Sequence, residues 1–165
     1  MNKSDNTRTT KHVTNKSVTH WLLRIGNGIH FNNSSSKFIW GINSKHSCSK
    51  SFIKKVKEGD ILWFVTGKSG GHLVAMAKYK RMDNRIIGPL INHSFTNEEL
   101  GWTELEGEWD MEIHYINLYN ISTCELYSGI RGPLSIRKYN DKCKVNLLDE
   151  YINILKYSAI TQTMK

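Results

Sequence analysis

The chain has 165 residues, of which 39% are hydrophobic, and 23 Lys and Arg against 15 Asp and Glu give a formal net charge of +8. This length suits one domain with a substantial core, and no apolar stretch approaches the ~20 residues of a membrane helix. The positive charge favours a polyanionic partner, nucleic acid before a membrane surface, and the polar N-terminus lacks an apolar signal segment, so we expect a cytoplasmic or nuclear protein that is not secreted.

Cysteine and histidine spacing excludes the common metal and disulfide motifs. The three cysteines, Cys48, Cys124 and Cys143, lie far apart, and the seven histidines form no H-E-x-x-H or H-x-E pair. An odd number of widely spaced cysteines fits neither a disulfide framework nor a zinc site. We therefore expect reduced thiols, no metal and no cofactor.

The first third of the chain divides into a polar leader and alternating short elements. Residues 1–17 are almost free of apolar side chains and predict a disordered basic leader before a single domain over 18–158. "VTHWLLRI" is typical of a strand that ends at "GNG", and "FIW" is a second short apolar run. Apolar residues at helical spacing in "SCSKSFIKKVK" predict an amphipathic helix over 47–57.

The remaining segments predict a β-hairpin and a closing helix. "ILWFV" and "HLVAMAKY" read as strands joined by the turn "TGKSGG", residues 81–110 as irregular, and "MEIHYINLYNIS" as a further strand. "SGIRGPLSI" is a basic loop, "NLLDEYINILKYS" a helix, and 159–165 a frayed tail. The fold class expected is α/β (α+β), a small curved, mostly antiparallel sheet or barrel flanked by a few helices.

No catalytic motif is complete. "GKSGG" lacks the first glycine of a phosphate loop, because Leu62 stands at that position, and no G-x-S-x-G occurs. Paired carboxylates between residues 98 and 112 can serve acid–base chemistry, but an acidic surface segment explains them as well. Nothing here requires catalysis, so we expect a protein that is not an enzyme.

The tryptophans carry the stronger signal. Trp40 and Trp102 lie in polar, glycine-containing surroundings, and Trp109 precedes a strand, whereas Trp63 and Trp21 lie in apolar segments typical of a core. Proteins hold a nucleobase between aromatic faces, at about 1–3 kcal/mol per stacked base. We expect Trp40 and Trp102 to face each other around such a base; core packing of both remains the alternative.

The order of these segments resembles the YTH and EVE domains of the PUA-like superfold, which read modified bases. The similarity lies in "HWLLRIGNG", "FIWGINSKHS", "VKEGDILWF", "DILWFVTGKSGGHLVAMAKY", "GWTELEGEWDMEIHYI" and "SGIRGPLSI", and spans about residues 18 to 155. The chain departs from the YTH pattern at Gly41, where that family has serine or cysteine. It also departs in the first strand, where only Arg24 and Asn27 match.

The resemblance implies a reader that accepts a methylated base, such as N6-methyladenosine, in single-stranded RNA or DNA. Trp40 and Trp102 would be the walls of an aromatic cage and Trp109 its floor. The base edge would be bound by Asn27, Gly41, Asn43 and Ser44, and the backbone phosphates by Arg24, Lys45, Lys68 and Arg131.

Three alternatives remain open. An EVE-like domain would read a modified cytosine in DNA. An ASCH domain of the same superfold would hydrolyse modified nucleosides, but "GKSGGHL" lacks the Glu and Arg of the ASCH pattern G-x-K-x-x-E-x-R. The aromatic residues could also bind a peptide or a modified side chain.

Overall fold

The computed structural model describes residues 18–66, 72–84, 95–102, 109–121, 136–139 and 156. Within these residues the chain forms six strands and two helices. In chain order they are β1 (His20–Arg24), α1 (Ile29–Ser35), β2 (Ile39–Ile42), α2 (Ser47–Lys55), β3 (Ile61–Thr66), β4 (His72–Asn84), β5 (Met111–Asn120) and β6 (Ile136–Lys138).

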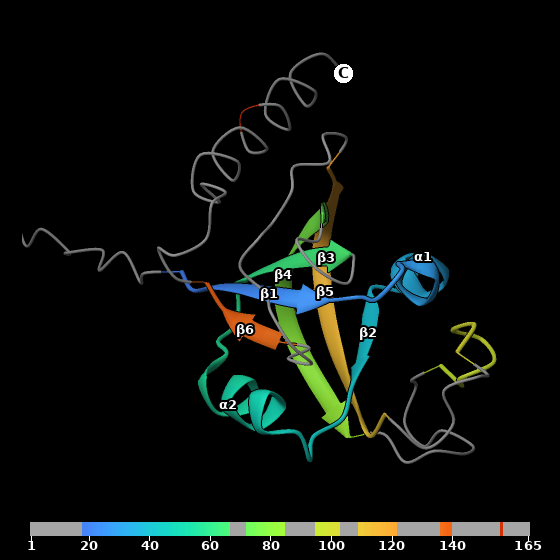
Figure 1. The fold of residues 1–165 in the computed structure, drawn as a ribbon, viewed down its shortest axis with the longest axis horizontal. Helices are drawn as coiled ribbons and strands as arrows, with labels where there is room; N and C mark the ends of the chain where they lie inside the picture. Colours follow the sequence, from blue (N-terminus) through green and yellow to red (C-terminus); the bar gives the residue numbers. More distant parts are fainter. Residues whose placement is uncertain are drawn as a thin grey trace, which may run out of the picture.

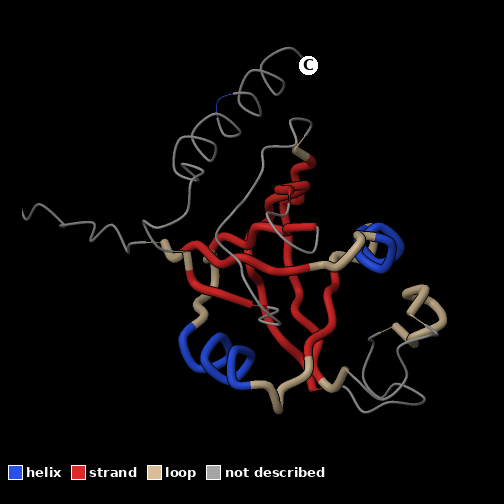
Figure 2. Tube along the Cα trace, in the orientation of Figure 1, coloured by secondary structure: helices blue, strands red, loops and turns tan. Residues whose placement is uncertain are grey.

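The strands form one mixed sheet in the order β2-β5-β4-β3-β1-β6 (Figures 1 and 2). β1 and β3 run parallel, and every other neighbouring pair is antiparallel. The sheet curls into a half-barrel, with α1 beside β2 and α2 beside β6. The expected α+β domain with a small curved sheet and a few helices is confirmed.

Bulges accompany the curvature of the sheet. The register shifts between Phe64 and Val65 where β3 pairs with β4, and twice along β4 where it pairs with β5. A bulge sets two residues opposite one, which bends the strand and increases its twist. The long strands β4 and β5 can therefore cross the sheet without lying flat.

Apolar side chains on the two faces of the sheet form two buried clusters. Leu62 and Phe64 of β3 join the larger cluster, whereas Trp63 joins the smaller one, because successive strand residues point to opposite faces. Trp21 and Trp63 are 2% and 0% exposed, so their expected place in the core is confirmed.

Most elements match the sequence prediction, and two were missed: α1, and β6, whose first residue Ile136 was placed in a basic loop. The β3–β4 hairpin and the helix predicted over 47–57 are confirmed, the latter as α2. The expectation that residues 81–110 are irregular is wrong at its start, because β4 continues to Asn84, and α1 was not expected at all. The leader, the basic loop up to residue 135, the closing helix apart from residue 156, and the tail lie outside the described residues.

Within the described part of the chain, no helix has the length and apolar character needed to span a membrane.

Candidate functional site

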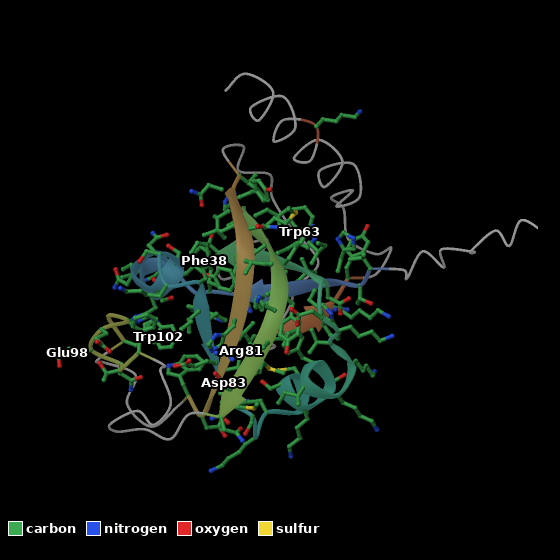
Figure 3. All side chains as sticks on the ribbon, turned by 180° about the vertical axis from the view of Figure 1, so that it is seen from behind. Phe38, Trp63, Arg81, Asp83, Glu98 and Trp102 are labelled. Carbon is green, nitrogen blue, oxygen red and sulfur yellow. The ribbon has the colours of Figure 1, made fainter. Side chains whose placement is uncertain are left out.

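Three tryptophans from distant parts of the chain meet at the β2 edge of the sheet. Trp40 lies in β2, Trp102 ends the segment 95–102, and Trp109 comes shortly before β5. Their ring centroids are 5.9 Å apart for Trp40 and Trp102, 6.2 Å for Trp40 and Trp109, and 6.5 Å for Trp102 and Trp109. We call these three residues the tryptophan cluster. Figure 3 shows Trp102 on the side of the molecule where α1 and β2 lie, away from Trp63.

The expected face-to-face arrangement of Trp40 and Trp102 is wrong. Their ring planes meet at 83°, so the edge of one indole packs against the face of the other. Aromatic pairs favour this geometry because the ring face is partly negative and the edge partly positive. Trp40 is 6% and Trp102 1% exposed, and both belong to the larger core cluster, as the alternative of core packing predicted. That the cluster binds a base stays a prediction.

Gly41 lets two of these rings approach the backbone of β2. A Cβ atom at this position would lie 2.9 Å from Cζ3 of Trp102 and 3.2 Å from Cγ of Trp109. Real Cβ atoms do not approach a ring atom to 2.9 Å, so any side chain here would displace an indole. The serine or cysteine of the YTH pattern is therefore incompatible with this packing of the cluster.

Helix α1 holds Trp102 in place. The Trp102 indole Nε1 donates a hydrogen bond of 3.1 Å to the backbone carbonyl of His30. The carbonyl of Gly101 lies 3.4 Å from Nδ1 of His30 and accepts a hydrogen bond of 3.5 Å from Asn33 Nδ2. His30 and Asn33 are thus site residues that the sequence did not indicate, because nothing in "IHFNNSS" predicts a helix that contacts a segment some 70 residues away.

The segment that presents Trp102 is itself an ordered turn. The backbone N–H of Thr96 donates to Glu99 Oε2 at 2.7 Å, and the backbone N–H of Glu99 donates to Thr96 Oγ1 at 3.1 Å. This reciprocal pair is the capping box that the pattern T-x-x-E forms at the start of a helical turn. The backbone N–H of Trp102 donates a hydrogen bond of 2.8 Å to the carbonyl of Asn97, which fixes the backbone at the tryptophan.

Trp109 differs from its two neighbours in its polar atom. Trp109 is half-buried, and its indole Nε1 is inaccessible to solvent and has no hydrogen-bond partner among the described residues. A buried donor without an acceptor costs about 1–3 kcal/mol. The cluster therefore contains a donor that a ligand with a suitable acceptor would satisfy.

A polar turn after β2 lies beside Trp109. The Ser44 backbone N–H donates to Asp110 Oδ1 at 2.6 Å, and the Ser44 hydroxyl donates to Asp110 Oδ2. Asn43 Oδ1 accepts a hydrogen bond of 3.0 Å from the Lys45 backbone N–H. The predicted base-binding side chains of Asn43 and Ser44 thus shape the turn that follows the cluster, and Asp110, which the sequence did not single out, anchors it.

The other predicted site residues lie in β1, in the turns before α1 and α2, or outside the described residues. Asn27 Oδ1 accepts a hydrogen bond of 3.0 Å from the Ile29 N–H at the start of α1, and Arg24 is half-buried at the end of β1. Lys45 is exposed, while Lys68 and Arg131 lie outside the described residues. The structure tests none of their proposed contacts with nucleic acid.

Ionisable side chains pair across β4 and β5. Glu112, cross-strand from Gly41, is fully buried, and its Oε2 lies 3.1 Å from His114 Nε2, which is 3.6 Å from Asp83 Oδ2. Arg81 in turn pairs with Asp83 at 3.4 Å. The contact between His114 and Asp83 joins the two strands, and the other two lie within one strand each. Among the described residues, no group of three His, Cys, Asp or Glu side chains is arranged to hold a metal ion.

Comparison with known proteins gives only distant structural likenesses. No family model matches the chain, and no curated protein matches it. Among solved structures, it is similar to a hypothetical protein from Leishmania major, with a TM-score of 0.48 and 12% identity over 88% of this chain and 98% of that chain. It is also similar to the MmI1 YTH domain, with a TM-score of 0.44 and 13% identity over 87% of this chain and 98% of that one. At these scores neither likeness carries an argument about function.

Proposed function

We propose that this protein binds single-stranded nucleic acid and accepts a methylated base, such as N6-methyladenosine in RNA, at the tryptophan cluster. The observation that carries the proposal is the meeting of three indoles around Gly41, with the buried N–H of Trp109 left without an acceptor among the described residues. A nucleobase suits such a site in two ways. Its flat face stacks on indoles, and its ring nitrogens or carbonyls can accept the hydrogen bond from Trp109.

Binding a base here requires the indoles to separate. Trp102 contacts the rings of both Trp40 and Trp109, and each such aromatic contact is worth about 0.5–1.5 kcal/mol. Stacking a base on an aromatic side chain returns about 1–3 kcal/mol per base. Loss of two ring–ring contacts costs about 1–3 kcal/mol and stacking of the base returns about the same, so the exchange is close to balanced. A methyl group then adds about 0.8 kcal/mol in favour of the modified base for the carbon it buries.

The charge of the chain favours the same class of partner. The net charge of +8 attracts a polyphosphate strand without regard to sequence. The exposed Lys45 follows Trp40 by five residues and can contact a phosphate next to the bound base. A single strand suits the site better than a duplex, because its bases reach a pocket at a smaller unstacking cost.

Substitutions of Trp109 test the proposal, because this residue is only half-buried and carries the unpartnered donor. Affinity is measured for matched short RNA strands with and without one N6-methyladenosine, and for DNA strands with and without methylcytosine. Trp109→Ala removes the ring and should reduce the preference for the methylated strand about tenfold or more, the equivalent of one stacking contact. Trp109→Phe keeps a ring but loses the N–H, so we expect an intermediate preference.

Trp63→Phe is the matched control for Trp109→Phe, because it makes the same replacement at a core tryptophan. The preference of this control for the methylated strand should equal that of the wild type. An unchanged preference in Trp109→Ala would contradict the role of the cluster. Wild-type protein that binds methylated and unmodified strands equally would contradict base reading altogether, and hydrolysis of a modified nucleoside would favour the ASCH-like alternative.

A further inference from the structure

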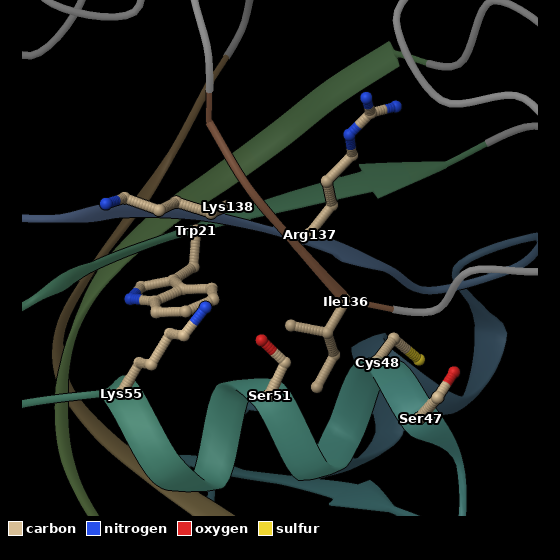
Figure 4. Close-up of a pocket in the computed structure, with 8 residues that line it drawn as sticks. All are labelled: Trp21, Ser47, Cys48, Ser51, Lys55, Ile136, Arg137 and Lys138. Atoms are coloured by element: carbon tan, nitrogen blue, oxygen red, sulfur yellow. The ribbon is translucent and has the colours of Figure 1, made fainter.

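A concave site lies at the edge of the sheet opposite the tryptophan cluster, between α2 and β6. It has a volume of about 270 Å³ and is lined by residues of β1, α2 and β6 (Figure 4). These residues are Trp21, Ser47, Cys48, Ser51, Lys55, Ile136, Arg137 and Lys138. We call this site the α2–β6 groove. None of its residues belongs to the tryptophan cluster.

One wall of the groove is a face of α2 with small side chains. Ser47, Ser51 and Lys55 follow each other at four-residue spacing, which places them on one side of the helix. Phe52, next to Ser51, is fully buried in the core and packs against Trp21. The two serines leave room for a ligand to approach the helix closely, and each hydroxyl can donate one hydrogen bond.

The floor of the groove is apolar and fixed. Trp21 and Ile136 are 2% and 3% exposed. The Trp21 indole Nε1 donates a hydrogen bond of 3.0 Å to Asp60 Oδ2, and its ring meets Phe52 edge to face at 4.9 Å. The groove is therefore formed before any ligand arrives.

The charge of the groove is positive. Lys55, Arg137 and Lys138 supply the ionised side chains, and the residues that line the groove include no carboxylate. The nearby Asp60 is 3% exposed behind the floor, where its carboxylate already accepts hydrogen bonds from the backbone N–H groups of Thr19 and Lys57 as well as from Trp21. Concave surfaces lined by one sign of charge concentrate ions of the opposite sign.

We propose that the α2–β6 groove binds the sugar–phosphate backbone of a single-stranded nucleic acid, separately from the base at the tryptophan cluster. Lys55 and Lys138 would contact phosphate oxygens, Ser47 and Ser51 would donate hydrogen bonds to them, and the apolar floor would pack against a sugar. The volume lies below the range of about 300–1,000 Å³ usual for sites that enclose a small molecule, which favours a segment of a longer chain. The choice of nucleic acid as the polyanion rests on the proposed function.

The test compares two double substitutions with equal change in charge on the full-length protein. Lys55→Glu with Lys138→Glu reverses two charges in the groove, whereas Lys50→Glu with Lys54→Glu reverses two exposed charges of α2 that do not line it. Affinity for unmodified and methylated single strands is measured as a function of salt. Loss of two phosphate contacts lowers the slope of log affinity against log salt by about 1.4, at about 0.7 per contact for single strands.

We expect the groove pair to weaken binding of both strands at least tenfold more than the control pair, with the preference for the methylated strand unchanged. Ser51→Trp fills the groove without changing its charge, and because Ser51 is exposed on α2 the protein should fold. This variant should weaken binding of both strands as well.

Two results would overturn the inference. Equal losses in the two charge-reversed pairs would mean that only net charge matters, and wild-type affinity in Ser51→Trp would mean that no strand occupies the groove. Either result leaves a preference for the methylated strand intact, so it is distinct from failure of the proposed function. If the proposed function itself fails, the wild-type protein will bind neither strand, or will bind the methylated and unmodified strands equally.

Discussion

The five tryptophans fall into two groups that differ in how their polar atoms are satisfied. In the adjacent strands β1 and β3, Trp21 donates to Asp60, and Trp63 Nε1 donates to Nδ1 of His20 at 2.9 Å. At the β2 edge, Trp102 donates to a backbone carbonyl, and Trp109 has no acceptor among the described residues. Each indole of the first group thus donates to a side chain, whereas the indole of Trp109 has no acceptor among the described residues.

This difference separates a framework from a candidate site. A buried indole with a matched side-chain acceptor is a fixed part of the core, because moving it would leave two polar groups unsatisfied. Trp109 is half-buried and its indole has no acceptor among the described residues, so moving this ring breaks no hydrogen bond of its Nε1 there. Trp63 and Trp109 therefore differ in how firmly each ring is held, and substitutions of these two residues test the distinction.

The largest effect is expected for Trp63→Ala. Trp63 is fully buried in the smaller core cluster, and Trp→Ala substitutions in cores cost about 3–5 kcal/mol in free energy of unfolding. This is a large share of the about 5–15 kcal/mol that stabilises a typical domain. Urea denaturation followed by far-UV circular dichroism measures the change.

Trp109→Ala is the matched comparison for Trp63→Ala, because it removes the same side chain from the cluster. We expect a cost at least about 2 kcal/mol smaller, since Trp109 is half-buried and its unpartnered N–H is removed with it. Equal costs for the two substitutions would show that the cluster is as much a part of the core as Trp63.

A second, smaller effect is expected for Gly41→Ala. The added Cβ would meet Cζ3 of Trp102 at 2.9 Å, and overpacking of this kind costs about 1–3 kcal/mol. Because the indoles must shift, the near-UV circular dichroism of the folded protein should also change.

Gly26→Ala is the control for the Gly41 substitution. Gly26 has a φ of +58° and no atom within 4 Å of an added Cβ, so its replacement strains the backbone but contacts no ring. Its near-UV spectrum should match that of the wild type. A wild-type spectrum in Gly41→Ala would mean that the cluster does not depend on close approach to β2.

The sequence predicts the framework well because its signals are local. The apolar runs "ILWFV" and "HLVAMAKY" and the periodicity of "SCSKSFIKKVK" depend only on neighbours in the chain. They place β3, β4 and α2 and assign Trp21 and Trp63 to the core. The same residues of α2 later line the groove, but nothing local indicates that β6 lies opposite them.

The cluster could be predicted in membership but not in geometry. Polar surroundings and glycine neighbours distinguish Trp40, Trp102 and Trp109 in the sequence, and the structure does bring them together. The angle between the rings depends on α1, whose residues 29–35 include two asparagines and two serines, which are weak helix formers. Tertiary contacts of the buried Phe31 stabilise that helix, and such contacts leave no pattern in the sequence.

The smallest expected effect concerns pH and the partner of Trp63. Burial lowers the pKa of His20 below its ordinary value of 6.5, against the opposing influence of Asp60, and Nδ1 of His20 must be unprotonated to accept the hydrogen bond from Trp63. Because the folded protein binds this proton less readily than the unfolded chain does, the stabilisation is fully present above pH 6.5. It is lost as the pH falls from that value towards the lowered pKa of the folded state.

The slope of the free energy of unfolding against pH contributed by His20 cannot exceed about 1.4 kcal/mol per pH unit, the value for one proton. His20→Gln removes the titrating group while its amide oxygen can still accept from Trp63. Urea denaturation between pH 7.5 and pH 5 should therefore show a shallower loss of stability in this variant than in the wild type. Tyr139, whose ring lies 6.4 Å from that of His20, provides a control as Tyr139→Phe, which should leave the slope unchanged. Parallel pH profiles for the wild type and His20→Gln would contradict the prediction, because they would mean that the stability of the protein does not depend on a neutral His20 beside Trp63.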